Sequence, residues 1–418
     1  MSSKLAVNLG GMFAAMAMLC SCASPKKKTK PVPTPEPTSE PTVEKPAEPA
    51  AKPVAEPVAK PEPKPVVKPE PKPEPEPAPA PKVSAIPDPL PDPDGKEADM
   101  TKPVQVFILM GQSNMLRMGR VGPATKDGAL ENAVKNKGLY PYLIDDAGNW
   151  TERKDVRDVQ VMGSGGPGRT KQICNQWLGV KSGKIGVEIG IGSYLGYALE
   201  APVMVLKSAI GNRSLSWDLL PPGTPRYSHK GKESPGYGET WPSKKDRSKI
   251  VPFEKGKTLG WYAGMQYDGD IDRARKVLAD LGKYYPGATK YEVAGFLYWQ
   301  GDKDRYNEAH AAAYEQNLVR LIRQLRKDFD APDAKFVCAT LGQTKKDATG
   351  NEKLILDAQL AVDGRTGKYP EFKGNVAAVY SNPLSKGGAS NGHYSGNAET
   401  YMNVGEAMGK AMVELLQN

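Results

Sequence analysis

The chain has 418 residues, a formal net charge of +9 and 39 prolines, most of which lie between Pro25 and Pro93. The remaining C-terminal region of about 320 residues is long enough to bury the core of one α/β domain. Its basic residues are scattered or lie in loops such as 244–247, without a basic helix or an aromatic-interleaved basic stripe, which disfavours nucleic-acid binding. The four cysteines are not spaced as a metal site or a disulfide framework.

Residues 1–22 have the pattern of an export signal. Lys4 precedes a short apolar stretch, and the sequence Leu-Cys-Ser-Cys ends at Cys22. The apolar stretch is too short for a good transmembrane helix. The segment resembles a bacterial lipoprotein signal peptide, which implies lipidation of Cys22, with Cys20 as a poorer alternative; the other reading is an ordinary secretory signal. We therefore expect an exported protein with a lipid anchor in a bacterial membrane, in the periplasm or at the cell surface.

Residues 23–101 repeat Pro, Glu and Lys and contain no aromatic residue. Such a segment cannot bury enough apolar surface to offset its ordering entropy, and its prolines favour polyproline II. We expect a disordered linker that acts as a semi-rigid stalk, with a reach on the order of 200 Å when fully extended.

Residues 102–418 are predicted to form one α/β domain, because strand patterns alternate with helix patterns. The predicted strands are 104–110, 203–207, 293–299, 335–340 and 375–380. The predicted helices are 187–199, 268–281, 305–329, 353–362 and 399–416. Residues 116–184 are expected to be irregular, with weak strand signals near 140–144, and residues 220–258 to form a surface insertion. This alternation predicts a five-stranded parallel sheet with helices on both faces and a ligand site at the carboxyl ends of its strands.

Polar or glycine-rich segments follow every predicted strand, and the first of them contains Ser113. We interpret Ser113 as a nucleophile, which requires an imidazole base. Only three histidines occur: His229 lies in the insertion and His310 in a predicted helix. The third, His393, follows the last strand in a glycine-rich loop and is the predicted base.

The sequence does not identify a single acidic residue that would orient His393. Asp302 and Asp304 follow the third strand, although a helix-capping role is equally credible for one of them. A Ser-His dyad oriented by a backbone carbonyl is the alternative.

An oxyanion hole needs donors aimed at the developing negative charge. The Ser113 N–H, Gly211 or Asn212, and the Gln300 amide lie at the predicted edge, and we also assign Gln112 and Asn114 to oxyanion or substrate binding. No nucleotide or metal motif is present, and no cofactor or metal is expected.

These motifs resemble the SGNH hydrolase superfamily, specifically carbohydrate O-acetylesterases that include sialate O-acetylesterases and acetylxylan esterases. The resemblance covers nearly all of 104–416, and it rests on four motifs in order: Gly111–Met115 with the later Gly186–Gly190, Lys207–Leu215, Trp299–Asp304, and Gly392–Tyr394. It implies a flavodoxin-like three-layer sandwich and a serine esterase that acts without a metal on acetylated sugars. By the same resemblance Ser113 is the nucleophile, His393 is the base, and Gly211, Asn212 and Gln300 assist the oxyanion.

The chain departs from this family pattern at two positions. Asp302 occupies a position where the family usually carries Glu. Ser390 occupies the position three residues before His393, where many hydrolases of this layout carry an Asp. The expected function is a membrane-anchored carbohydrate O-acetylesterase, in which Trp217, Trp299 and Tyr394 offer stacking faces to a sugar. The alternative is a catalytically decayed carbohydrate-binding lipoprotein on the same scaffold; a lipase is disfavoured because the insertion is polar.

Overall fold

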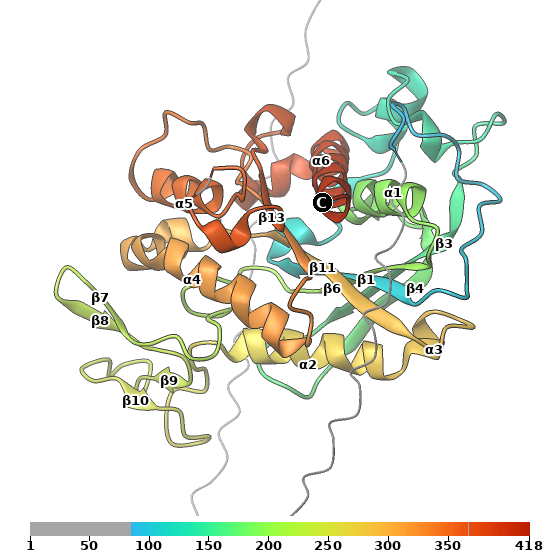
Figure 1. Ribbon diagram of the computed structural model, residues 1–418. Coiled ribbons are helices and arrows are strands. Elements are labelled where there is room, and N and C mark those ends of the chain that lie inside the picture. The colour runs from blue at the N-terminus through green and yellow to red at the C-terminus, as the bar shows by residue number, and fades with distance from the viewer. Residues whose placement is uncertain (1–84, 367) are drawn as a thin grey trace, which may run out of the picture. The chain divides into compact units, whose positions relative to one another are not determined.

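The computed structural model describes residues 85–418 apart from residue 367. The predicted signal, Cys22 and most of the predicted linker lie outside the described residues. The described chain is built on a mostly parallel seven-stranded sheet with the strand order β13-β12-β11-β1-β6-β3-β4, in which only β4 is antiparallel to its neighbour (Figure 1). The strands are β1 (Val104–Gly111), β3 (Glu152–Met162), β4 (Lys171–Gly179), β6 (Val203–Ser208), β11 (Tyr291–Trp299), β12 (Lys335–Ala339) and β13 (Val376–Val379).

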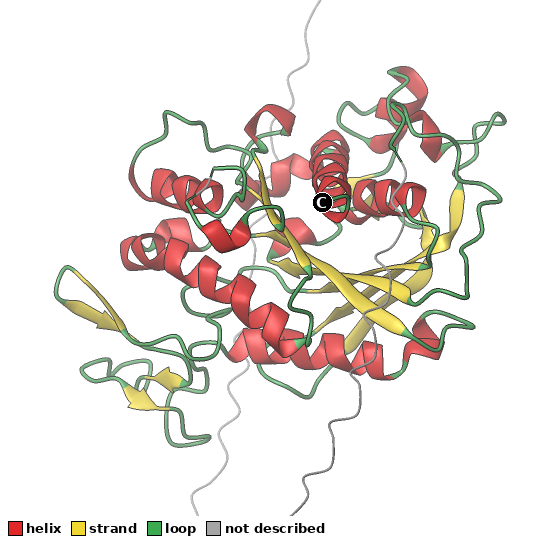
Figure 2. Cartoon of the chain, viewed as in Figure 1, coloured by secondary structure: helices red, strands yellow, loops and turns green. Residues whose placement is uncertain are grey.

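Helices cover both faces of this sheet, as Figure 2 shows. The main helices are α1 (Glu188–Ala198), α2 (Met265–Ala279), α3 (Leu281–Tyr284), α4 (Glu308–Asp328), α5 (Gly350–Ala361) and α6 (Ala398–Leu416). Side chains alternate along β1, so that Phe107 packs in the core under α1 and α6, whereas Ile108 packs in the core under α2, α4 and α5. Every residue of β1 is buried, which places this strand at the centre of the described domain.

Short elements connect these layers. The turns of 3-10 or π-helix are η1 (Ser113–Met115), η2 (Asn132–Asn136), η3 (Pro141–Leu143), η4 (Asp304–Tyr306), η5 (Pro370–Phe372), η6 (Asn382–Leu384) and η7 (Ser390–Gly396). The small strands are β2 (Gly119–Arg120), β5 (Lys184–Ile185), β7 (Tyr227–His229), β8 (Lys232–Ser234), β9 (Glu239–Thr240) and β10 (Val251–Pro252). The predicted insertion therefore contains two small strand pairs, β7-β8 and β9-β10.

The α/β class and the five predicted strands are confirmed, but the predicted count of five is wrong because β3 and β4 extend the sheet to seven strands. Both lie in the section expected to be irregular, and the weak signal near 140–144 corresponds to η3 instead. The β3 sequence is rich in charged residues, which normally mark exposed segments. Arg153, Asp155 and Asp158 are nevertheless buried, because Arg153 forms a two-pronged hydrogen bond with Asp155 and Asp158 pairs with Arg117.

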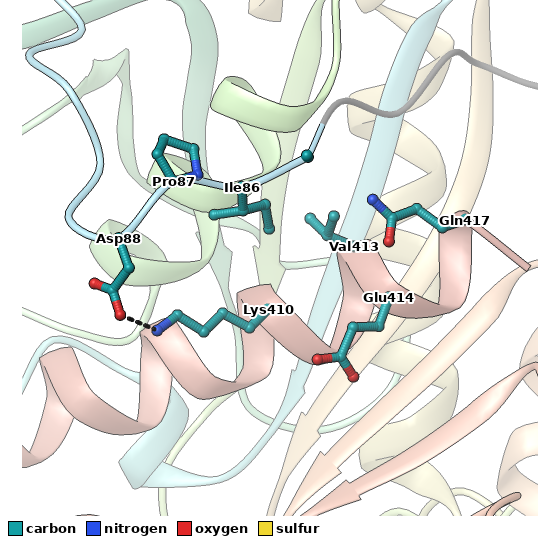
Figure 3. Close-up of a pocket in the computed structure, with 8 residues that line it drawn as sticks. Ile86, Pro87, Asp88, Lys410, Val413, Glu414 and Gln417 are labelled. Carbon is teal, nitrogen blue, oxygen red and sulfur yellow. Dashed lines mark ion pairs between the residues drawn. The ribbon is translucent and has the colours of Figure 1, made fainter.

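The last part of the predicted linker packs against the domain. Leu90 is buried in the core, and the Lys96 ammonium donates hydrogen bonds to carbonyl oxygens at the end of α1, including those of Tyr197 and Leu199 at 3.2 Å each. Figure 3 shows residues 85–88 beside α6, where Asp88 forms an ion pair with Lys410 at 3.9 Å. Part of the predicted linker thus contacts the domain, because these contacts depend on single side chains rather than on composition.

Within the described part of the chain, no helix is both long and apolar enough to cross a membrane.

A buried network of charges joins the elements beneath the end of β1. The Lys207 ammonium of β6 lies 2.6 Å from the Glu188 carboxylate of α1, and both side chains are completely buried. Arg117, which follows η1, lies 3.6 Å from Glu188 and also pairs with Asp158 of β3. Burial would raise the pKa of Glu188, but Lys207 and Arg117 outweigh it and lower that pKa to about 2. Glu188 is therefore ionised at neutral pH, and Lys207 and Arg117 stabilise its buried charge.

Replacing Lys207 by Met should destabilise the protein by about 3–5 kcal/mol, because the substitution leaves a buried carboxylate without its nearest partner. Urea unfolding measures this loss. The additional change Glu188→Leu should recover most of the stability, since it removes the unpaired charge. The exposed pair of Lys353 and Asp357 is the matched control, where Lys353→Met should cost less than about 1 kcal/mol. Equal unfolding midpoints for Lys207→Met and the native protein would contradict this role.

Candidate active site

Ser113 lies in η1, immediately beyond the carboxyl end of the central strand β1. It is partly exposed, whereas its neighbours from 111 to 116 are buried. The strand turns sharply at Gly111, which has φ +138, and a β-carbon at Gly111 would lie 2.4 Å from the carbonyl oxygen of Trp299. Only glycine fits this position, and the turn it permits presents the next exposed side chain, Ser113, at the sheet edge.

The loop after β6 borders Ser113. A β-carbon on Gly211 would lie 3.3 Å from the Ser113 β-carbon, so any side chain there would crowd the hydroxyl. The next residue, Asn212, is exposed and has a left-handed backbone with φ 57. The backbone N–H groups of Ser113 and Gly211 have no hydrogen-bond acceptor among residues 85–418 as described. Two free donors beside a hydroxyl can stabilise negative charge that develops on a bound carbonyl.

His393 lies in η7, which contacts η1, so the turns that contain the predicted nucleophile and base are neighbours. The Tyr401 hydroxyl of α6 links the two turns: it lies 3.3 Å from the His393 carbonyl oxygen and 3.4 Å from Oδ1 of Asn114. The His393 ring makes no hydrogen bond with a described residue. The imidazole is therefore not held by another side chain of the described residues.

The backbone around His393 is strained. His393, Tyr394 and Ser395 are all left-handed, with φ values of 51, 50 and 54. Each such residue costs about 1–2 kcal/mol relative to ordinary backbone. Burial of the Tyr394 ring, which stacks on Trp299 at 5.6 Å, and the hydrogen bond from the Gly342 N–H to its hydroxyl offset part of this cost. Strain of this kind concentrates at sites where function fixes one conformation.

The structure separates the two predicted acids. Asp302 faces the His393 loop, where its Oδ1 accepts a hydrogen bond from the Ser390 hydroxyl at 2.5 Å and from Arg305 at 2.9 Å. Ser390 is the residue that stands where the family carries an Asp before its histidine. The Asp302 carboxylate therefore approaches the position of the missing acid from another loop.

Asp304 instead supports the loop that contains Gly211. It is completely buried and accepts hydrogen bonds from the N–H groups of Leu215 (2.9 Å) and Ser216 (3.0 Å) and from the Gln300 amide (2.5 Å). Burial raises the pKa of Asp304 to about 6, although these hydrogen bonds act in the opposite direction. The carboxylate holds the segment after β6 in place at a distance from the His393 loop.

The other predicted site residues are buried and partly engaged elsewhere. Gln300 donates to the Arg213 carbonyl at 2.8 Å and to Asp304, its amide nitrogen also lies 3.4 Å from Oε1 of Gln112, and its oxygen accepts a hydrogen bond from Tyr314. Gln112 accepts a hydrogen bond from the Lys303 N–H at 3.3 Å, which ties the Ser113 turn to the loop after β11. The Asn114 amide nitrogen is buried and has no partner among the described residues.

The remaining histidines belong to other elements, and the three residues expected to stack on a sugar differ in exposure. His229 is in β7, and His310 is in α4, where burial lowers its pKa to about 4. Trp299 and Tyr394 are buried and pack in the core, whereas Trp217 is partly exposed. Sequence reasoning missed Tyr401, because it occurs on the apolar face of a helix and its hydroxyl contacts are long-range. Across residues 85–366 and 368–418, no group of three or more His, Cys, Asp or Glu side chains is arranged to hold a metal ion.

Exchanging Asp304 for Asn should destabilise the protein, because Asn replaces an acceptor of three donors by a group that is itself a donor. The deficit should depend on pH. The pKa of Asp304 is higher in the folded chain than in the unfolded one, so its contribution is greatest below about pH 4 and declines as pH rises to about 6. The stability deficit of the variant should therefore narrow by at most roughly 3 kcal/mol over that window. Urea unfolding at several pH values tests this; a deficit that widens with pH would contradict it.

Residues 243–414 match the model of a family described as carbohydrate esterase, sialic acid-specific acetylesterase. No curated protein matches the chain significantly.

Among solved structures, a protein of Arabidopsis thaliana is similar at 17% identity with a TM-score of 0.41, over 74% of this chain and 98% of that one. A carbohydrate acetylesterase from Xanthomonas citri is similar at 14% identity with a TM-score of 0.42, over 73% of this chain and 55% of that one. NanS is similar at 14% identity with a TM-score of 0.36, over 69% of this chain and 79% of that one. The family match confirms the predicted resemblance over residues 243–414.

Proposed function

We propose that the protein is a serine esterase that removes O-acetyl groups from carbohydrate. The observation that carries this proposal is the meeting of three segments at one sheet edge: Ser113 at the end of β1, the Gly211 loop after β6, and the His393 turn before α6. The family match over residues 243–414 supports carbohydrate esters as the substrate. The fold that we infer is of the SGNH type, with β3 and β4 as additional strands beyond the five predicted.

In the proposed reaction, the Ser113 hydroxyl oxygen attacks the acetyl carbonyl carbon while His393 accepts the hydroxyl proton. The carbonyl electron pair moves to oxygen, and this oxyanion accepts hydrogen bonds from the N–H groups of Ser113 and Gly211. When the carbonyl re-forms, the bond to the sugar oxygen breaks, and that oxygen takes the proton from His393. Water then attacks the acetyl-enzyme with His393 as base, which releases acetate and restores Ser113.

We further propose that Asp302 is the acid behind His393, acting through Ser390. The support for this choice is the 2.5 Å hydrogen bond between Ser390 and Asp302, together with the position of Ser390 in the His393 loop. Asp304 is already committed to the Leu215 and Ser216 N–H groups. In this arrangement the Asp302 charge stabilises the imidazolium that forms during each half of the reaction.

Lipidation at Cys22 and export are proposed with this function. A lipid anchor followed by a long stalk would allow the esterase domain to reach polymeric substrates away from the membrane surface.

Replacing Ser113 by Ala should reduce acetate release from p-nitrophenyl acetate and from acetylated xylan to the background rate, because the acyl group then has no acceptor. Circular dichroism and the unfolding midpoint should match those of the native protein, since Ser113 makes no hydrogen bond with a described side chain. An unchanged rate would contradict the mechanism. Glycan binding by a native protein that releases no acetate from any ester would instead favour the catalytically decayed alternative.

The change Asp302→Asn should lower kcat by about 10²-fold with little effect on KM, since the carboxylate assists proton transfer rather than substrate binding. The double variant Asp302→Asn with Ser390→Asp returns a carboxylate to the His393 loop and should recover much of the rate. Arg305→Met is the control: it breaks the ion pair with Asp302 but leaves the carboxylate, and it should keep most of the activity. A failure of Asp302→Asn to slow the reaction would leave a Ser-His dyad as the mechanism.

A further inference from the structure

The insertion after the Gly211 loop carries a large share of the charge of the chain. Residues 220–258 contain nine Lys or Arg residues and four Asp or Glu residues, which gives a net charge of +5 out of the +9 of the whole sequence. The segment 243–249, between β9 and β10, is exposed at every position. Lys244, Lys245 and Arg247 form no ion pair with an acidic side chain of the described chain. Their charge is therefore directed to solvent and attracts anions.

An aromatic surface lies directly beside these cations. The rings of Trp217 and Trp241 lie 4.8 Å apart at an angle of 33°, and both side chains are partly exposed. The Arg247 guanidinium lies 4.6 Å from the centre of the Trp241 ring. The apolar face of a sugar ring packs well on exposed Trp, and the Arg247 guanidinium, which lies over the Trp241 ring, is suited to a sugar carboxylate. These two features together favour an acidic sugar over a neutral one.

This surface and part of the candidate active site belong to the same segment, between β6 and α2. Trp217 follows Leu215 and Ser216, whose N–H groups are fixed by Asp304, and the same loop begins with Gly211 beside Ser113. The insertion connects the carboxyl end of β6 to the start of α2, so it belongs to the sheet edge where Ser113 lies. Figure 1 shows β7–β10 projecting from the body of the domain beside α4 and the start of α2. A polymer bound on the insertion could therefore extend to Ser113.

We propose that Trp217, Trp241, Lys244, Lys245 and Arg247 form a binding surface for an acidic polysaccharide that contains uronic acid residues. The inference rests on the proposed esterase function and names the class of its substrate. The Trp pair packs against sugar rings, and the three cations pair with carboxylates along the polymer. The esterase centre then acts on acetyl groups of a chain that is held at several points, which strengthens its binding without new contacts at Ser113.

Binding can be tested separately from catalysis with the full chain carrying Ser113→Ala and with polygalacturonate, an acidic polymer without acetyl groups, as the probe. Isothermal titration should show binding to polygalacturonate and none to dextran, a neutral polymer. Affinity should fall as salt is raised from about 0.05 M to about 0.5 M, because the attraction between exposed charges is screened. Because this probe carries no ester, failure of the esterase proposal would appear in the acetate assay and not in this one.

Charge-reversal variants test whether these residues form the binding surface. Lys244→Glu with Lys245→Glu should weaken polygalacturonate binding roughly tenfold or more at low salt. The matched control is Lys283→Glu with Lys290→Glu, which makes the same charge change at exposed positions near the start of β11, at the opposite edge of the sheet, and should leave binding unchanged.

Trp241→Ala should also weaken binding, and Trp241→Phe should retain part of it, because the smaller ring still offers a stacking face. Equal losses of polygalacturonate affinity in the Lys244/Lys245 variant and in the Lys283/Lys290 control would overturn the proposal. Equally tight binding of double-stranded DNA that is insensitive to Trp241→Ala would also overturn it, since the surface would then be a general polyanion site.

Discussion

The architecture depends on a buried network of four charged side chains beneath the end of the central strand. Glu188 of α1 and Lys207 of β6 are completely buried, and Arg117 connects them to Asp158 of β3. Two carboxylates and two cations balance one another in an interior where any unpaired charge would be costly. Because Arg117 follows the Ser113 turn directly, the same network fixes the segment that presents Ser113, the nucleophile that we propose.

In the candidate site next to this network, an unfavourable backbone conformation is offset by favourable side-chain packing. The His393 turn is held in a left-handed conformation against its own backbone preference, while the stacked rings of Trp299 and Tyr394 and the Tyr401 hydroxyl hold it near Ser113. Burial of aromatic rings in the core thus supplies the stabilisation that keeps a strained loop in one place. The loop itself remains partly exposed, which the proposed role of His393 as a base requires.

Two carboxylates that are close in sequence have separate positions and, we propose, separate tasks. Asp304 is fully buried and organises the Gly211 loop through backbone N–H groups, whereas Asp302 reaches Ser390 on the His393 loop. The Gly at 301 has φ +135, and the turn that begins there sends these two side chains to different loops. A Ser at position 390 is compatible with the catalysis that we propose, because the Asp302 carboxylate comes from the loop after β11.

The sequence by itself determined the α/β class, the five core strands, the main helices and the assignment of Ser113 and His393 to one edge. Hydrophobic periodicity is a local property, and the carboxyl ends of parallel strands must converge. Only the tertiary structure decided that the charged segment 152–162 is a buried strand, since its partners Arg117 and β6 are distant in sequence. It also decided that Asp302 and Asp304 diverge and that Gln300 is held by Asp304 and Arg213, because hydrogen bonds between loops leave no periodic trace in the sequence.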